Sequence, residues 1–201
     1  MTMPDKSQRV DVLGVGISAL NLESAKKTIL ERLKRREKGY ICVTGVHGVI
    51  EAQDDSKFRN ILNQSFLTTP DGMPMVWISW LQKHHEVDRV YGPDLMLEMA
   101  QATQDGKYTH FLYGGRPGIA ELLQKRLEER YPGIRIVGSY TPPFGPLSPE
   151  QEGELRERFR QLKPDVTWVG LSTPKQERFM SDYLPKFDTT VMCGVGAAFD
   201  F

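Results

Sequence analysis

One carboxylate, Asp71, stands where a chemically active group would be expected. It belongs to the segment Thr-Pro-Asp-Gly at 69–72, which follows an apolar, strand-like pair and precedes a helix-like run. Pro70 favours an extended conformation before it, and Gly72 tolerates the positive φ of a sharp turn. A carboxylate on such a turn faces the carboxyl edge of a parallel sheet, where open α/β folds bind ligands. The alternative is that Asp71 only caps the helix that follows.

Polar residues or glycines follow five other strand-like runs in the same way. Because the carboxyl ends of parallel strands share one edge, we expect these residues to line a single cleft together with Asp71. They are Thr44, the pair Gly114 and Gly115, the pair Tyr140 and Thr141, the pair Lys175 and Gln176, and the segment Gly-Val-Gly at 194–196.

Some of these residues suit a ligand that carries phosphate. Gly114 and Gly115 precede a helix, so backbone N–H groups and the helix dipole there could cradle an anion. Lys175 stands at a helix start, where its charge opposes the dipole, and this favours an anionic partner. Tyr140 could stack on a base or contact phosphate, or it could simply cover the core from a turn.

Several common binding motifs are absent from the sequence. It contains neither Gly-x-Gly-x-x-Gly nor a P-loop ending in Gly-Lys-Ser/Thr, which disfavours a nicotinamide-dependent oxidoreductase. No Asp-x-Asp pair follows a strand, and two cysteines with four histidines give no zinc spacing. We therefore expect no metal and no cofactor, with anionic charge neutralised by Arg, Lys, helix N-termini and backbone amides. The formal net charge of +0 implies no bulk attraction to nucleic acid.

The elements that would position these residues alternate along the chain. Short apolar runs alternate with amphipathic runs, which indicates an α/β protein with a Rossmann-like, mostly parallel sheet and helices on both faces. We expect one domain over residues 1–201. The expected strands are 10–15, 40–44, 66–70, 109–113, 134–138, 165–170 and 190–193, and the expected helices are 21–37, 49–53, 56–64, 75–84, one ending near 104, 119–131, 148–162 and 178–184.

Apolar spacing also predicts which residues lie in the core. Trp77, Trp80 and Leu81 share one face of the helix expected at 75–84, so we expect that face to be buried. Cys42 and Cys193 each lie in an apolar, strand-like run, which predicts two reduced core cysteines. No stretch approaches the length of a membrane span and no signal peptide is present, so a cytoplasmic location is expected.

Several motifs, taken in order, resemble those of the WecG/TagA/CpsF glycosyltransferases, glycosyltransferase family 26. The resemblance runs from about Leu13 to Phe201. It rests on Thr-Pro-Asp-Gly at 69–72, Arg-Val-x-Gly-x-Asp-Leu at 89–95, Gly-Gly-x-Pro-Gly at 114–118, Tyr-x-Pro-Pro-Phe at 140–144, Gly-Leu-x-x-Pro-Lys-Gln-Glu at 170–177 and Gly-Val-Gly-Ala-Ala-Phe-Asp at 194–200.

The resemblance implies a reaction and its partners. A metal-independent, inverting enzyme would move a sugar from a UDP-sugar donor to a polyprenyl-diphosphate-linked saccharide, on the inner face of the cell membrane, in cell-surface polysaccharide synthesis. The sugar would be N-acetylmannosamine, its uronic acid or another hexose. The resemblance also hints at a homo-oligomer. The alternative is a nucleotide-binding regulatory or scaffolding module of the same fold without turnover.

The resemblance also assigns roles to matching residues. Asp71 matches the general base that would deprotonate the acceptor hydroxyl, and one carboxylate suffices because UDP leaves as an anion. Arg89 would steady the diphosphate. Gln176 and Thr44 would position sugar or acceptor, and Tyr140 and Asp200 would hold the nucleotide.

Two features depart from the family pattern. Teichoic-acid members carry Asn where this chain has Val46, so a hydrogen bond to the sugar is lost unless His47 supplies one, and a donor without an acetamido group becomes plausible. The chain also stops at Phe201, within an apolar run. We expect a basic, amphipathic segment that contacts the membrane surface to follow in the natural protein. Without it, we expect UDP binding with weak or no transfer.

Overall fold

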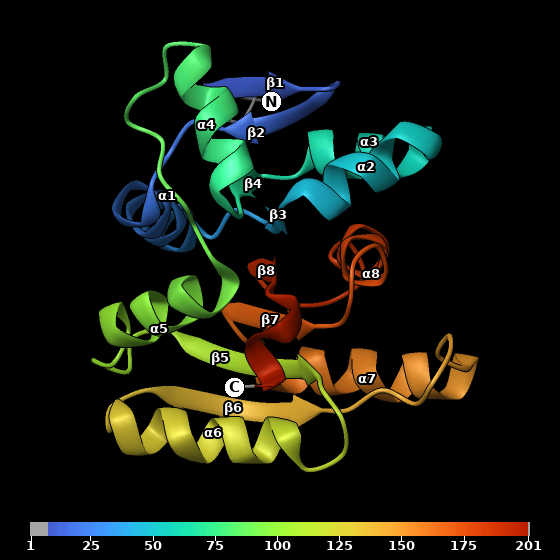
Figure 1. Ribbon diagram of the computed structural model, residues 1–201. Helices are drawn as coiled ribbons and strands as arrows, with labels where there is room; N and C mark the ends of the chain where they lie inside the picture. The colour runs from blue at the N-terminus through green and yellow to red at the C-terminus, as the bar shows by residue number, and fades with distance from the viewer. Residues whose placement is uncertain (1–7, 201) are drawn as a thin grey trace.

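A computed structural model describes residues 8–200, apart from the side chains of Ala197 and Asp200 (Figure 1). A six-stranded sheet runs through them, and every neighbouring pair of its strands is parallel. The predicted α/β, Rossmann-like class is confirmed. Across the sheet the order is β4 (Leu67–Pro70), β3 (Gly39–Thr44), β8 (Val191–Gly194), β7 (Val166–Gly170), β5 (Thr109–Gly114) and β6 (Arg135–Tyr140).

Helices cover both faces of this sheet (Figure 1). Strand residues alternate between two cores: in β3, Ile41 and Val43 pack into one, while Tyr40 and Cys42 pack into the other. The first core is closed by α1 (Leu22–Arg35), α5 (Gly92–Ala102) and α6 (Ile119–Arg130), and the second by α2 (Val46–Asp54), α3 (Ser56–Gln64), α7 (Pro149–Leu162) and α8 (Lys175–Tyr183).

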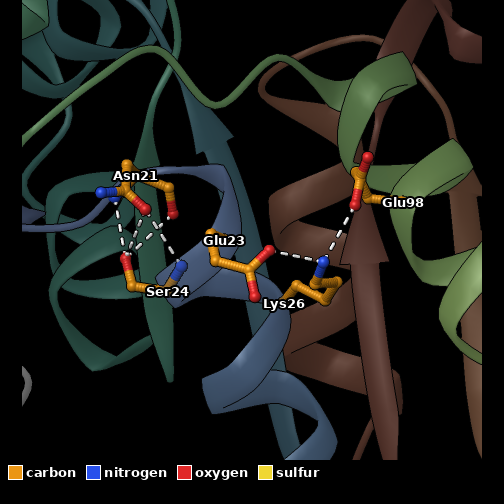
Figure 2. A network of polar contacts seen from close by, with 5 residues as sticks. All are labelled: Asn21, Glu23, Ser24, Lys26 and Glu98. Atoms are coloured by element: carbon orange, nitrogen blue, oxygen red, sulfur yellow. Dashed lines mark hydrogen bonds and ion pairs between the residues drawn. The ribbon is translucent and has the colours of Figure 1, made fainter.

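Local sequence explains where α1 begins and how it is held. The side chain of Asn21 accepts a hydrogen bond from the Ser24 N–H at 3.0 Å, and the Ser24 hydroxyl accepts one from the Asn21 N–H at 2.9 Å. Figure 2 shows this reciprocal cap, which satisfies backbone donors that the helix itself leaves free. Figure 2 also shows Lys26 between Glu23 and Glu98, and the contact with Glu98 ties α1 to α5.

The expected first strand at 10–15 is wrong. The chain instead forms an antiparallel hairpin of β1 (Arg9–Val12) and β2 (Val15–Ser18), separate from the parallel sheet. Leu13 and Gly14 turn between them with φ of 53° and 82°. Positive φ at both central residues is the geometry of a tight two-residue hairpin turn, and leucine seldom adopts it. The apolar pattern therefore predicted one strand where a turn at Leu13 and Gly14 separates two.

The expected core face of α4 (Met73–Leu81) is also wrong. Trp77, Trp80 and Leu81 are 55%, 40% and 84% exposed, whereas Met75 and Val76 are buried. The helix lies beyond the sheet edge against the β1–β2 hairpin, where it can bury only one narrow face (Figure 1). Because its residues are apolar all round, their spacing does not distinguish the buried face.

The two cysteines are free and buried, as predicted. They lie on the neighbouring strands β3 and β8, but Cys42 packs into one core and Cys193 into the other, so they face opposite sides of the sheet. Within residues 8–200, no helix combines the length and the apolar character needed to cross a membrane.

Candidate active site at the carboxyl edge of the sheet

Thr44 and Asp71 meet at the ends of adjacent strands. Thr44 ends β3, Pro70 ends β4, and the Asp71 N–H donates a hydrogen bond to the Thr44 carbonyl oxygen at 3.0 Å. Gly45 makes this approach possible, because a Cβ there would lie 2.8 Å from the Asp71 carbonyl oxygen. The turn around Asp71 is therefore fixed by backbone contacts to β3.

Arg89 lies on the segment that runs beside this turn. The Val90 N–H donates to the Pro70 carbonyl oxygen at 2.8 Å, and an Arg89 Nη2 lies 3.7 Å from Asp94 Oδ2. Burial raises the pKa of Asp71, while the charge of Arg89 lowers it and the charge of Asp94 raises it further. A carboxylate with a raised pKa holds an abstracted proton better, as a general base must.

The same segment reaches the turn after β8. Gly92 opens α5 so close to Val195 that a Cβ on it would lie 2.9 Å from the Val195 carbonyl oxygen. One residue further, the Gly196 N–H donates to Oε1 of Gln176 at 3.0 Å. Gln176 is buried, so its amide joins the start of α8 to the end of β8.

Glu177 completes this edge, and the sequence reasoning did not select it. Its side chain is buried, and its Oε1 accepts hydrogen bonds from Gln176 Nε2 at 3.1 Å and from Thr173 Oγ1 at 2.9 Å. Burial raises the pKa of Glu177, against opposing effects of these hydrogen bonds and of His47. In sequence, Glu177 looks like an ordinary acid in the first turn of a helix. The only signal that could have identified it is its place in the Pro-Lys-Gln-Glu motif.

Backbone packing accounts for Gly114 and Gly115. Both have positive φ, of 127° and 75°, and a Cβ on Gly114 would lie 2.4 Å from the Gly170 carbonyl oxygen. The Gly115 N–H donates to the same oxygen at 3.1 Å, and the Phe199 ring covers Gly115. The Gly115 N–H is thus already hydrogen-bonded, and the phosphate cradle stays a prediction.

The remaining predicted nucleotide-binding residues lie around this edge. Tyr140 ends β6 and stacks on Tyr113 with 5.7 Å between ring centroids. Lys175 opens α8, as predicted, with its Nζ 5.4 Å from the ring centroid of the exposed Phe144.

Two further predicted site residues, His47 and Asp200, have few described contacts. His47 lies on the first turn of α2, with Nε2 3.4 Å from Glu51 Oε1. Asp200 ends the short 3₁₀ helix Gly196–Asp200, and its side chain lies outside the described part of the structure. Within residues 8–200, no group of three or more His, Cys, Asp and Glu side chains is placed to hold a metal ion.

Comparison with known families agrees with these motifs. The model of the family described as "Glycosyl transferase WecG/TagA/CpsF family" matches residues 10–201. The chain belongs to that family. Asp71 follows β4, Thr44 ends β3 and Gln176 lies in the first turn of α8, after β7, and their roles in the reaction stay predictions.

Two curated relatives carry the same name, N-acetylglucosaminyldiphosphoundecaprenol N-acetyl-beta-D-mannosaminyltransferase. The protein of Staphylococcus aureus (strain NCTC 8325 / PS 47) is 27% identical over 204 residues, which cover 100% of this chain and 78% of the relative. The protein of Bacillus subtilis (strain 168) is 27% identical over 146 residues, which cover 73% of this chain and 55% of the relative.

Proposed function

We propose that this protein transfers a hexosyl group from a UDP-sugar to a polyprenyl-diphosphate-linked saccharide, with inversion and without a metal ion. The observation that carries the proposal is the placement of Asp71. Its turn is hydrogen-bonded to the end of β3, its pKa is raised by burial, and Arg89 is the nearby cation that acts on it. Membership of a glycosyltransferase family supports the reaction class.

The proposed chemistry needs one base and one means of stabilising the leaving group. Asp71 accepts the proton of the acceptor hydroxyl as that oxygen attacks the anomeric carbon from the face opposite UDP. The bond from the anomeric carbon to the diphosphate oxygen breaks, and UDP leaves with the electron pair. Arg89 offsets the charge that develops on the diphosphate, which is the role that a metal ion has in other transferases.

The donor sugar is proposed from the relatives and from one substitution. The printed names of both relatives make N-acetylmannosamine the first sugar to test. Val46, which is 47% exposed at the first position of α2, offers no hydrogen bond from its side chain to an acetamido group. A hexose without that group is therefore the second candidate.

A transfer assay on the full natural protein tests the proposal. UDP-N-acetylmannosamine and UDP-hexoses without an acetamido group are offered with a short-chain analogue of N-acetylglucosaminyl-diphosphoundecaprenol, with and without EDTA. We expect transfer that EDTA leaves unchanged. Loss of transfer in EDTA, restored by Mg²⁺, would contradict metal independence.

UDP titration separates the alternatives. We expect UDP to stabilise the protein against thermal unfolding, because a ligand that binds the native state raises its stability. Stabilisation by UDP without transfer from any donor would support the non-catalytic nucleotide-binding module instead. Stabilisation by NAD and not by UDP would contradict both.

A further inference from the structure

Glu177 is a buried acid in the first turn of α8. Its side chain is 1% exposed, and none of the ion pairs among the described residues includes it. Its Oε2 is buried and finds no hydrogen-bond partner in the described part of the chain. Burying a carboxyl group destabilises the folded protein unless its hydrogen bonds offset the lost hydration.

The hydrogen bonds of Glu177 fix the amide of Gln176. Because Gln176 Oε1 accepts from the Gly196 N–H at 3.0 Å, its Nε2 must face the other way. There it donates to Glu177 Oε1 at 3.1 Å. An amide nitrogen carries two hydrogens, so this arrangement uses one and leaves the second with a fixed direction.

The other contact of Glu177 leads back to the Thr44–Asp71 pair. Thr173 Oγ1 donates to Glu177 Oε1 at 2.9 Å. A Cβ on Gly48 would lie 3.0 Å from Thr44 Cγ2 and 3.9 Å from Thr173 Cγ2, so both threonines lie next to the same turn of α2. Thr44 Oγ1 is likewise buried without a partner among the described residues. Glu177 therefore holds Thr173, which lies beside the same turn of α2 as Thr44.

We propose that Glu177 is a positioning residue for the transfer reaction. It holds the Gln176 amide and the Thr173 hydroxyl in the orientation that a sugar substrate requires. This role rests on the proposed function. Glu177 itself does not contact the substrate, because its carboxyl is enclosed, and it acts through Gln176.

A double-mutant cycle tests this role in the transfer assay. We expect Glu177→Ala to lower kcat at least tenfold, with less than a threefold change in KM for the donor. In the Gln176→Ala background the same substitution should cost less than threefold, because the side chain that it positions is already gone. Glu177→Gln should retain kcat within about threefold, since its amide oxygen still accepts both hydrogen bonds.

The matched control is another buried polar contact far from this edge. Thr167→Val breaks the hydrogen bond between the Thr167 and Thr189 hydroxyls, which are 2.9 Å apart, and should lower Tm without changing kcat. If Glu177→Ala does not fold, Glu177→Asp replaces it in the cycle, because its carboxylate is one methylene too short to reach both donors.

Three outcomes would overturn the inference. They are an unchanged kcat in Glu177→Ala, an equal loss in both backgrounds of the cycle, or a Glu177→Gln variant as inactive as Glu177→Ala. Each presupposes transfer by the wild-type protein. A wild-type protein that binds UDP but transfers no sugar would instead contradict the proposed function itself.

Discussion

Buried polar side chains lie at both ends of the parallel sheet, and they differ in how their hydrogen bonds are completed. At the amino end, His110 near the start of β5 accepts a hydrogen bond from Trp168 Nε1 on its Nδ1 at 3.1 Å. Its Nε2 lies 2.9 Å from Thr103 Oγ1, which in turn donates to the Met99 carbonyl oxygen. With Nδ1 as acceptor, Nε2 carries the proton, so the tautomer of His110 is fixed by its partners.

At the carboxyl end, some buried side-chain oxygens have no hydrogen-bond partner among the described residues. Four buried side-chain atoms of the described residues lack a partner, and three are at this end: Thr44 Oγ1, Thr69 Oγ1 and Glu177 Oε2. The fourth, Arg32 Nε, belongs to a guanidinium over the Phe66 ring near the start of β3. Since buried polar groups are nearly always paired, these three unpaired oxygens distinguish the carboxyl end from the surroundings of His110. Around His110, both ring nitrogens have partners within the chain.

The largest expected difference between the two ends is in activity. Asp71→Asn should lower transfer by about 10²–10⁴-fold, the usual range for removing a general base, and should leave UDP binding unchanged. Its Tm should stay the same or rise, because the substitution removes a buried carboxyl whose pKa is already raised. Transfer assays, UDP titration and thermal unfolding on one preparation measure all three.

The control makes the same Asp→Asn substitution at a position away from the site. Asp54 ends α2 with an exposed side chain, so Asp54→Asn should alter neither transfer nor Tm. An Asp71→Asn variant that keeps its turnover would remove Asp71 from the reaction, whatever its stability.

The sequence predicted the features that neighbouring residues determine, and it failed where contacts between distant segments decide. The bounds of α3, Ser56–Gln64, were predicted correctly because residues close in sequence fix them. The exposed face of α4 was not, because its burial depends on where the hairpin packs. Nor was Glu177, whose contacts depend on how the segment after β7, α8 and the turn after β8 come together. Strand-end residues such as Asp71 could be predicted because parallel topology alone places them.

The amino end should respond in stability and not in activity. Thr103→Val removes the oxygen that His110 Nε2 contacts and leaves a buried N–H unpaired, which costs about 1–3 kcal/mol. For a chain of this size that lowers Tm by roughly 2–4 °C per kcal/mol. The kcat of the folded variant should equal that of the wild type. A fall in kcat together with Tm would show that the two ends are coupled.

The two ends should also respond to pH with opposite sign. Burial lowers the pKa of His110 to about 4, so between about pH 6.5 and 4 the unfolded chain binds more protons than the native one and stability falls as pH falls. Burial raises the pKa of Asp71 and of Glu177, so their contribution to stability grows as pH falls.

Denaturant unfolding at pH 7 and pH 5 measures these contributions. The His110 contribution should cost the wild type about 2 kcal/mol between these values, and His110→Gln should lose that much less because its side chain does not titrate. Asp71→Asn should lose more stability than the wild type over the same range. Equal pH slopes in wild type and His110→Gln would mean that His110 is not held neutral.

The smallest expected effect is the sharpest test of the unpaired oxygens. Thr69→Val replaces a fully buried hydroxyl that has no partner among the described residues with a methyl group of the same shape. Because no hydrogen bond is lost and a desolvated oxygen is removed, its free energy of unfolding should change by less than about 0.5 kcal/mol or rise. The matched variant, Thr103→Val, makes the same chemical change where both hydrogen bonds exist. If the two variants lose equal stability, the Thr69 hydroxyl is paired in solution, and the contrast between the two ends of the sheet fails at that residue.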